Sequence, residues 1–197
     1  MKLLEDRIVR DGRVLEGNVL LVDRFLNQQI DVELIDALAK EFARRFAADG
    51  VQKVLTVEAS GIGVAALTAQ ALRVPMVFAK KTRSTNLVDT VYSAPVRSYT
   101  HGNVNTIMVS KEFIKAGERI LLIDDFLAHG EALKGLVSLV GQGGAAVVGA
   151  GIVIEKSYQG GGEELRAQGL RIESLARISS MSIENGVTFA PDPGEQL

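Results

Sequence analysis

The stretch that decides the fold is Ile120-Leu121-Leu122-Ile123-Asp124-Asp125-Phe126-Leu127-Ala128-His129-Gly130-Glu131-Ala132. Four apolar residues end in two adjacent carboxylates, and a loop of small residues follows. This pattern predicts a strand over 120–124, a loop, and a helix from about Ala132 to Gln142. In an open parallel sheet, ligands bind beyond the carboxyl ends of the strands. The stretch therefore predicts both an α/β fold and the place of its ligand site.

The same residues offer two kinds of recognition side by side. Asp124 and Asp125 can accept hydrogen bonds from the vicinal hydroxyls of a ribose, because a carboxylate accepts and a diol donates. The loop Ala128–Ala132 can turn backbone N–H groups toward an anion, just ahead of a helix N-terminus. A competing interpretation is a solvated strand end followed by a helix N-cap. Spacing alone does not decide between the two.

Alternating apolar strands and amphipathic helices surround this stretch. Apolar strands are expected over 53–57, 74–79 and 146–154, and such continuous apolar runs suit parallel strands covered on both faces. A helix through Ala47 is expected to begin at an Asp31 N-cap, and another to cover 61–72. Shorter elements are expected nearer the N-terminus: a helix with a short strand within 1–15 and an extended run over 18–22. Glycine clusters at 141–144 and 160–162 indicate loops.

The polar, Thr/Ser/Asn-rich stretch 82–112 interrupts this alternation. It predicts either a flexible excursion or a hairpin. No internal repeat or shift in composition marks a second domain. We therefore expect residues 1–197 to form a single domain.

Composition excludes several classes of protein. The 197 residues are 47% hydrophobic and 23% charged, with a net charge of −2 and no cysteine. A globular chain without disulfides or thiolate chemistry is expected. Lys and Arg are spread along the chain and form no basic stripe, so a nucleic-acid partner is not expected. No apolar run is long enough for a signal peptide or a membrane span, so the expectation is a soluble, cytoplasmic protein.

Two motif classes are also missing. The histidines, His101 and His129, lack the spacing of metal ligands, so no protein-held metal site is expected. No Gly-x-x-x-x-Gly-Lys segment occurs, which argues against a P-loop nucleotidase.

The stretch 120–132 resembles the phosphoribosyl pyrophosphate (PRPP) signature of the type I phosphoribosyltransferases. That family commonly has threonines in the loop, whereas this chain has Ala128 and Ala132 there and adds the imidazole of His129. Binding of the 5-phosphate would then depend mainly on backbone N–H groups. The resemblance implies a mainly parallel sheet flanked by helices, a small hood from about 1–30 plus C-terminal residues, and a flexible flap within 82–112.

Within that family the chain resembles the bacterial xanthine phosphoribosyltransferases over nearly its whole length. Five blocks carry the resemblance: Val22-Asp23 with Phe25-Leu26-Asn27, Glu58-Ala59-Ser60-Gly61-Ile62, Val77-Phe78-Ala79-Lys80-Lys81, Ile123–Ala128 and Ile154-Glu155-Lys156-Ser157. The resemblance implies transfer of a phosphoribosyl group from PRPP to N9 of xanthine, giving xanthosine monophosphate and pyrophosphate. A transferase for guanine or hypoxanthine, and a non-catalytic PRPP-sensing regulator, remain alternatives.

The resemblance also assigns roles to single residues. It implies that Asp124 and Asp125 hold the ribose, that Ala128, His129, Gly130, Glu131, Ala132, Ser60, Gly61 and Lys81 bind the phosphates of PRPP, and that Leu20, Asn27 and Lys156 bind the base. Each of these positions also has a purely structural interpretation: Leu20 as a core residue, Asn27 as a turn residue, Lys156 as a lysine at a strand end, Ser60-Gly61 as a βα turn, and Lys80-Lys81 as a solvated pair. Mg²⁺ bound mainly through PRPP, and a homodimer in which Lys81 serves its own or the partner subunit, are implied as well.

Overall fold

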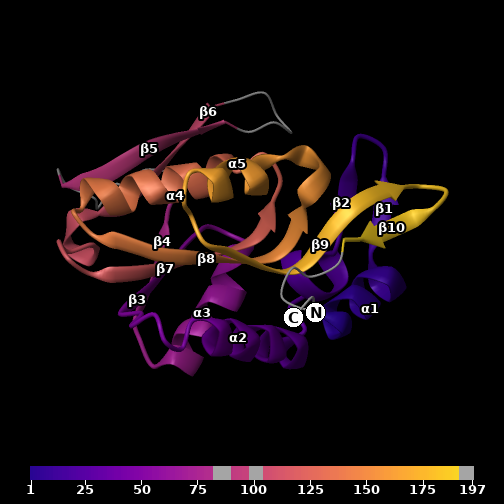
Figure 1. Cartoon of the computed structure of the whole chain (residues 1–197), viewed down its shortest axis with the longest axis horizontal. Helices are drawn as coiled ribbons and strands as arrows, with labels where there is room; N and C mark the ends of the chain where they lie inside the picture. Colours follow the sequence, from indigo (N-terminus) through magenta and orange to yellow (C-terminus); the bar gives the residue numbers. More distant parts are fainter. Residues whose placement is uncertain (82–89, 98–103, 191–197) are drawn as a thin grey trace.

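A six-stranded sheet in the order β10-β9-β8-β7-β3-β4 forms the centre of the computed structural model, which describes residues 1–81, 90–97 and 104–190 (Figure 1). Its strands are β3 (Lys53–Val57), β4 (Met76–Ala79), β7 (Arg119–Leu127), β8 (Ala146–Lys156), β9 (Ile172–Ser182) and β10 (Gly186–Phe189). All neighbouring pairs are parallel except β9 and β10. The predicted mainly parallel sheet is confirmed.

The order of the strands reverses between β3 and β7. From β3 the chain continues to β4 on one side, whereas β7, β8 and β9 follow one another on the other side. The loops that leave β3 and β7 therefore diverge at this point, and a crevice opens between them. Asp124 and Asp125 lie on one of these two strands.

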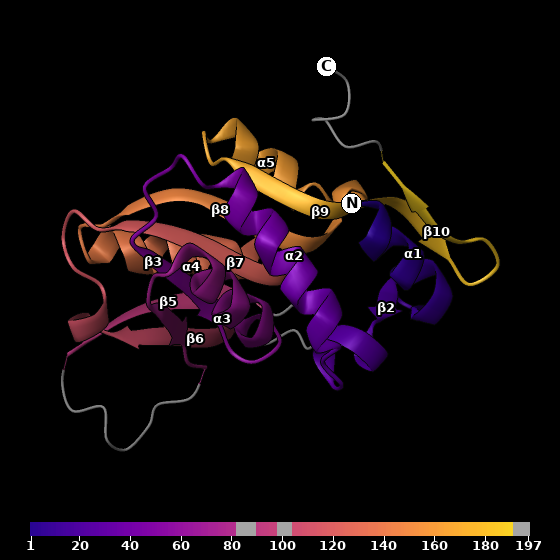
Figure 2. The same cartoon turned by 90° about the horizontal axis from the view of Figure 1, so that it is seen from below.

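Helices cover both faces of the sheet (Figures 1 and 2). On one face lie α2 (Val32–Arg45) and α3 (Gly61–Leu72), and on the other lie α4 (Glu131–Gln142) and α5 (Gly161–Ala167). Each face has its own apolar core because both are sealed from water. Phe42, Leu121 and Ile123 belong to the first core, and Leu122 and Leu136 belong to the second. Helix α2 begins where predicted, since the Asp31 carboxylate accepts a 3.2 Å hydrogen bond from the backbone N–H of Leu34.

The N-terminal elements gather at one end of the sheet, near β9 and β10 (Figure 1). They are α1 (Lys2–Asp11), the antiparallel pair β1 (Arg13–Leu15) and β2 (Val19–Leu21), and a π-helical turn over Asp23–Asn27. These residues are the region predicted to form the hood. The C-terminal residues 191–197 lie outside the described part of the chain.

The stretch 82–112 contains the hairpin that was one of its two predictions. Strands β5 (Val91–Arg97) and β6 (Val104–Ser110) pair antiparallel, with Ala94 opposite Ile107. Both of these residues are buried, because the pair packs against α4. A 3-10 turn over Lys111–Phe113 follows. Residues 82–89 and 98–103, which include His101 and part of the expected flap, lie outside the described ranges.

The structure corrects three boundaries. Strand β7 continues to Leu127 instead of ending at Asp124, so Asp125 also lies inside the strand rather than in the loop after it. Gly161 and Gly162 open α5 instead of forming a loop, because the left-handed Gly160 (φ 78°) already makes the turn. Gly141 lies in the last turn of α4. Strands β9 (Ile172–Ser182) and β10 (Gly186–Phe189) are not among the elements predicted from the sequence.

Strand β8 carries a bulge near its start. Ile120 of β7 pairs with Val147, but Leu121 pairs with Gly149, so Val148 is an extra residue in β8. Gly149 lies where a Cβ atom would be 2.6 Å from the ring of Phe46, so only glycine fits here. Beyond the bulge the two strands stay in register as far as Leu127 and Glu155.

Candidate active site

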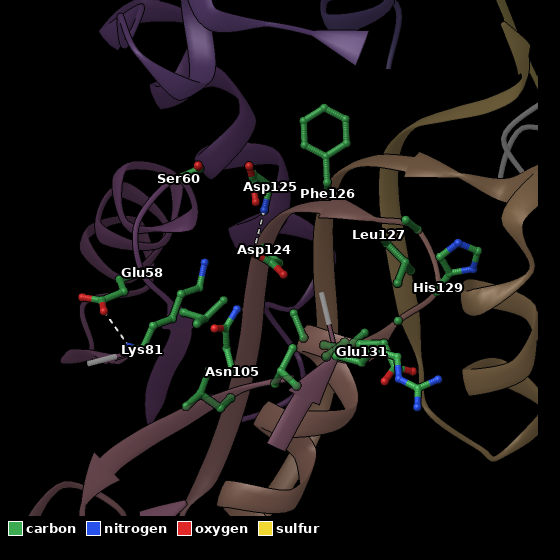
Figure 3. Close-up of a pocket in the computed structure, with 18 of the residues that line it drawn as sticks. Glu58, Ser60, Lys81, Asn105, Asp124, Asp125, Phe126, Leu127, His129 and Glu131 are labelled. Carbon is green, nitrogen blue, oxygen red and sulfur yellow. Dashed lines mark hydrogen bonds between the residues drawn. The ribbon is translucent and has the colours of Figure 1, made fainter. Parts of the chain in front are cut away.

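A cleft of about 370 Å³ opens beyond the carboxyl ends of β3 and β7, where the strand order reverses (Figure 3). It brings together most of the residues predicted to bind PRPP. Its lining comprises the turn after β3, the last residues of β7, the loop into α4, and parts of the β5–β6 hairpin: Val57–Ser60, Lys81, Val96, Arg97, Asn105, Ile107 and Asp124–Leu133.

The acid pair forms the floor of this cleft. Asp124 is only 4% exposed, and its Oδ1 accepts a 3.0 Å hydrogen bond from the backbone N–H of Asp125. Burial raises the pKa of Asp124 well above its usual range, and the neighbouring Asp125 carboxylate raises it further. Burial also raises the pKa of Asp125, although hydrogen bonds from Asp124 and Ser60 oppose that rise. Burial and mutual repulsion therefore disfavour a negative charge on both carboxylates at once.

The turn after β3 packs closely against this floor. The peptide between Glu58 and Ala59 is cis, and Ser60 is the N-cap of α3. A Cβ atom on Gly61 would lie 2.3 Å from the buried hydroxyl of Thr56 and 3.2 Å from Oδ1 of Asp124. Only glycine permits α3 to begin so close to the acid pair.

Lys81 supplies positive charge on the opposite wall. Its backbone N–H donates a 2.6 Å hydrogen bond to Oε1 of Glu58, and its side chain points toward Asp124 (Figure 3). The ammonium group opposes the rise in the pKa of Asp124. Lys81 is thus a cation that stands beside the acid pair within one subunit.

The loop into α4 has the backbone form of an anion site. Gly130, the N-cap of α4, has φ 80°, and no side chain of the described residues caps this end of the helix. The first N–H groups of α4 are therefore available to a ligand. Glu131, an acid in the first turn, is paired with Lys134 at 3.3 Å. His129 lies at the far end of the cleft from the acid pair (Figure 3).

The three residues predicted to bind the base do not line this cleft. Lys156 ends β8 and donates a 2.7 Å hydrogen bond from Nζ to the carbonyl oxygen of Asn18, in the β1–β2 turn. Its ammonium group lies 5.6 Å from the ring centroid of Phe126, which does line the cleft. Lys156 is therefore separated from the cleft by one aromatic ring.

Leu20 and Asn27 lie in the N-terminal elements. Leu20 is 5% exposed and belongs to the core that contains α1 and α2. Asn27 ends the π-helical turn, and its Oδ1 atom is buried with no hydrogen-bond partner among the described residues. A buried amide oxygen without a donor is costly, so a ligand donor at this position would stabilise the structure.

Comparison with known proteins identifies the family. A family model for the phosphoribosyl transferase domain matches residues 22–170. The chain belongs to the phosphoribosyltransferase family. A xanthine phosphoribosyltransferase of Lachnoclostridium phytofermentans is 52% identical over 193 residues, which cover 98% of this chain and 100% of the relative. One from Alkaliphilus metalliredigens is 51% identical over 195 residues, which cover 99% and 96% of the two chains.

Solved structures show the same phosphoribosyltransferase fold. The adenine phosphoribosyltransferase of Giardia lamblia, in complex with 9-deazaadenine, superposes with a TM-score of 0.76 at 20% identity, covering 90% of this chain and 98% of that one. The Trypanosoma brucei enzyme gives 0.75 at 18% identity, covering 98% and 86%. At this level of identity the likeness concerns the fold alone.

Some residues of this phosphoribosyltransferase cleft had been given no role from the sequence. Phe126 lies inside the motif that contains Asp124 and Asp125, and an aromatic residue there suggests no chemistry by itself. Glu58 belongs to a block that carried the family resemblance. Arg97 and Asn105 belong to the β5–β6 hairpin, and no motif around either residue predicts that it lies across the cleft from β7.

The described residues hold no group of three or more His, Asp and Glu side chains that could bind a metal ion. Within the same ranges, no helix is long and apolar enough to cross a bilayer.

Proposed function

We propose that this phosphoribosyltransferase transfers the 5-phosphoribosyl group of PRPP to N9 of xanthine, giving xanthosine 5′-monophosphate and pyrophosphate. The observation that carries the proposal is identity at about half of all positions with proteins named xanthine phosphoribosyltransferase, over 98–99% of the chain. The cleft at the reversal point supports it, because its acid pair and its uncapped helix end suit a ribose phosphate.

The acid pair supplies the electrostatics of the reaction. Cleavage of the glycosidic bond to pyrophosphate leaves positive charge on the ribose ring. In the free protein, burial and mutual repulsion disfavour two charges on Asp124 and Asp125. A developing cation above them removes that penalty, so the pair favours the transition state over the ground state. Their oxygens also accept hydrogen bonds from the ribose hydroxyls.

The other PRPP contacts follow from the walls of the cleft. The backbone of Ala128, His129, Gly130, Glu131 and Ala132 would hold the 5-phosphate, while Ser60, Gly61 and Lys81 would face the pyrophosphate. Mg²⁺, when bound, would neutralise the leaving pyrophosphate. Because the described residues lack a full set of metal ligands, the ion would be held chiefly by oxygens of PRPP and water.

For the base we propose a position over Phe126, between the cleft and the hood residues. Lys156 would leave the Asn18 carbonyl and face an oxygen of the purine. Its ammonium group favours the xanthine anion, which is the better nucleophile. Asn27 would offer its unpartnered oxygen to an N–H group of the base, and Leu20 would pack against the ring.

A panel of purine bases with PRPP and Mg²⁺, scored by pyrophosphate release, tests the proposal. Xanthine should be turned over best, and guanine and hypoxanthine more slowly. Strong turnover of adenine with none of xanthine would refute the choice of substrate. PRPP binding without turnover of any base would favour a regulator instead.

Asp125→Ala tests the role of the acid pair. It removes a carboxylate aimed at developing charge, so kcat should fall by about 100-fold or more. The circular dichroism spectrum should be unchanged, because the side chain lines the cleft and belongs to neither apolar core. Normal turnover by the folded variant would show that the acid pair has another role.

Two further expectations complete the proposal: a homodimer, tested by light scattering after gel filtration, and a cytoplasmic location, tested by cell fractionation.

A further inference from the structure

The loop expected to hold the 5-phosphate does not keep its shape alone, because it rests on α5. The backbone N–H of Gly161, the first residue of α5, donates a 3.2 Å hydrogen bond to the carbonyl oxygen of Ala128. A Cβ atom on Gly161 would lie 2.4 Å from that oxygen and 2.7 Å from the backbone nitrogen of Gly130. From the other side, a Cβ atom on Gly130 would lie 2.9 Å from Leu165. Backbone is in contact with backbone here, so a shift of α5 must move the loop.

Helix α5 has only seven residues and needs an external anchor. The anchor is Glu155, a fully buried carboxylate near the end of β8. Its two oxygens accept hydrogen bonds of 2.7 Å from the two terminal nitrogens of Arg166, on α5. Ser174 of β9 donates a third hydrogen bond, at 2.5 Å. Two-point contact with a planar guanidinium fixes orientation as well as distance.

The space around this pair allows little movement. A Cβ atom on Gly162 would lie 2.2 Å from Oε1 of Glu155. Burial alone would raise the pKa of Glu155, but the hydrogen bonds from Arg166 and Ser174 lower it below its usual value. Glu155 is therefore a charged, fully partnered group that cannot turn toward the cleft. The exposed Lys134–Glu164 ion pair, at 3.0 Å, also joins α4 to α5, but such exposed pairs contribute little.

We propose that Glu155 and Arg166 are positioning residues for the PRPP 5-phosphate: the ion pair between the buried Glu155 and the partly buried Arg166 fixes α5, and α5 fixes the backbone of 128–130. This inference rests on the proposed function and adds a residue pair that does not itself line the cleft. It also gives β8 a double role. Lys156, at the base side, and Glu155, at the phosphate side, are consecutive residues whose side chains contact opposite parts of the molecule.

Glu155→Gln tests the proposal, because the amide keeps the shape but leaves Arg166 without its anion. The KM for PRPP and the dissociation constant of ribose 5-phosphate, titrated calorimetrically, should each rise by about tenfold. The KM for xanthine should stay within about twofold, since the base side is untouched. Gly161→Ala should produce the same pattern by pressing on Ala128 directly, without disturbing the ion pair.

Glu118→Gln is the matched control. Glu118 accepts two 2.7 Å hydrogen bonds from the buried Lys53, at the amino ends of the central strands β3 and β7, opposite the end that carries the cleft. Glu118→Gln should lower the unfolding temperature but leave the KM for PRPP and the dissociation constant of ribose 5-phosphate unchanged. If Glu155 had only a structural role, Glu155→Gln would behave like Glu118→Gln: its unfolding temperature would fall, and its binding of PRPP and ribose 5-phosphate would not change.

The proposal is overturned if Glu155→Gln and Gly161→Ala bind ribose 5-phosphate as the wild type does, or if Glu118→Gln weakens binding equally. Wild-type protein that neither binds ribose 5-phosphate nor releases pyrophosphate would instead refute the proposed function, and this inference with it.

Discussion

Gly61→Ala probes the packing beneath the acid pair. The added methyl would lie 2.3 Å from Oγ1 of Thr56, which is about 0.7 Å inside the 3.0 Å limit for real contacts, and 3.2 Å from Oδ1 of Asp124. Thr56 is fully buried on β3, so α3 or the acid pair must move. Overpacking of this kind costs about 1–3 kcal/mol. At about 2–4 °C for each kcal/mol in a chain of this size, the unfolding temperature should fall by about 2–12 °C.

The same displacement should reach the chemistry. A shift of about 1 Å in a positioned group can cost about 100-fold in rate. Turnover by Gly61→Ala should therefore fall by about 10- to 100-fold at a temperature where the variant is still folded. Differential scanning calorimetry and initial-rate assays on the same preparation give both quantities.

Gly141→Ala is the control for this substitution. Gly141 lies in the last turn of α4, and a Cβ atom there would meet nothing within 4 Å. Replacing a helical glycine by alanine in open space should stabilise the protein by about 0.5–1 kcal/mol without changing turnover. If Gly61→Ala proves as stable and as active as Gly141→Ala, the close packing of α3 against Asp124 does not constrain the site.

Two further predictions concern charge in the site. Burial raises the pKa of Asp124 above its unfolded value of 3.8, so its ionisation lowers the stability of the folded state as the pH rises from about 4 through the folded pKa. At pH 7, Asp124→Asn should therefore unfold at a higher urea concentration than the wild type, and this difference should disappear below about pH 4. The variant should also lose turnover. Equal stability of the two proteins at pH 7 would show that the charge on Asp124 does not destabilise the folded state. Lys156→Met removes the ammonium group that donates to Asn18 and should raise the KM for xanthine by about tenfold or more, with little change in the KM for PRPP. An equal rise in both constants would place Lys156 outside the base site.

The parallel core of the fold could be predicted because its strands are continuous apolar runs. The strand over 53–57 and the helix over 61–72 were predicted with the bounds that the structure has. Strand β9 was missed because its sequence mixes apolar residues with Ser174 and Arg177. Those polar residues are tolerated because they face Glu155, 19 and 22 positions earlier in the chain. A pattern confined to one segment does not contain that partner.

The same limit applies to the site. The acid pair and the loop into α4 are contiguous in sequence, so one motif predicted them together, and the structure brings them to one cleft with Ser60 and Lys81. The contact between Lys156 and Asn18 joins residues 138 positions apart. Only the assembled sheet brings such residues together. The assignments of Leu20, Asn27 and Lys156 to the base stay predictions.

The extra residue in β8 makes the length of that strand matter as much as its composition. Val148 sets the register of every later residue of the strand against β7. Deleting it would move Glu155 and Lys156 back by one place, and neighbours in a strand point to opposite sides. The carboxylate would then turn toward the β1–β2 turn, and the ammonium group would turn toward Arg166. A gain or loss of one residue between the bulge and the end of β8 would therefore exchange the two sides of the strand, whatever its composition.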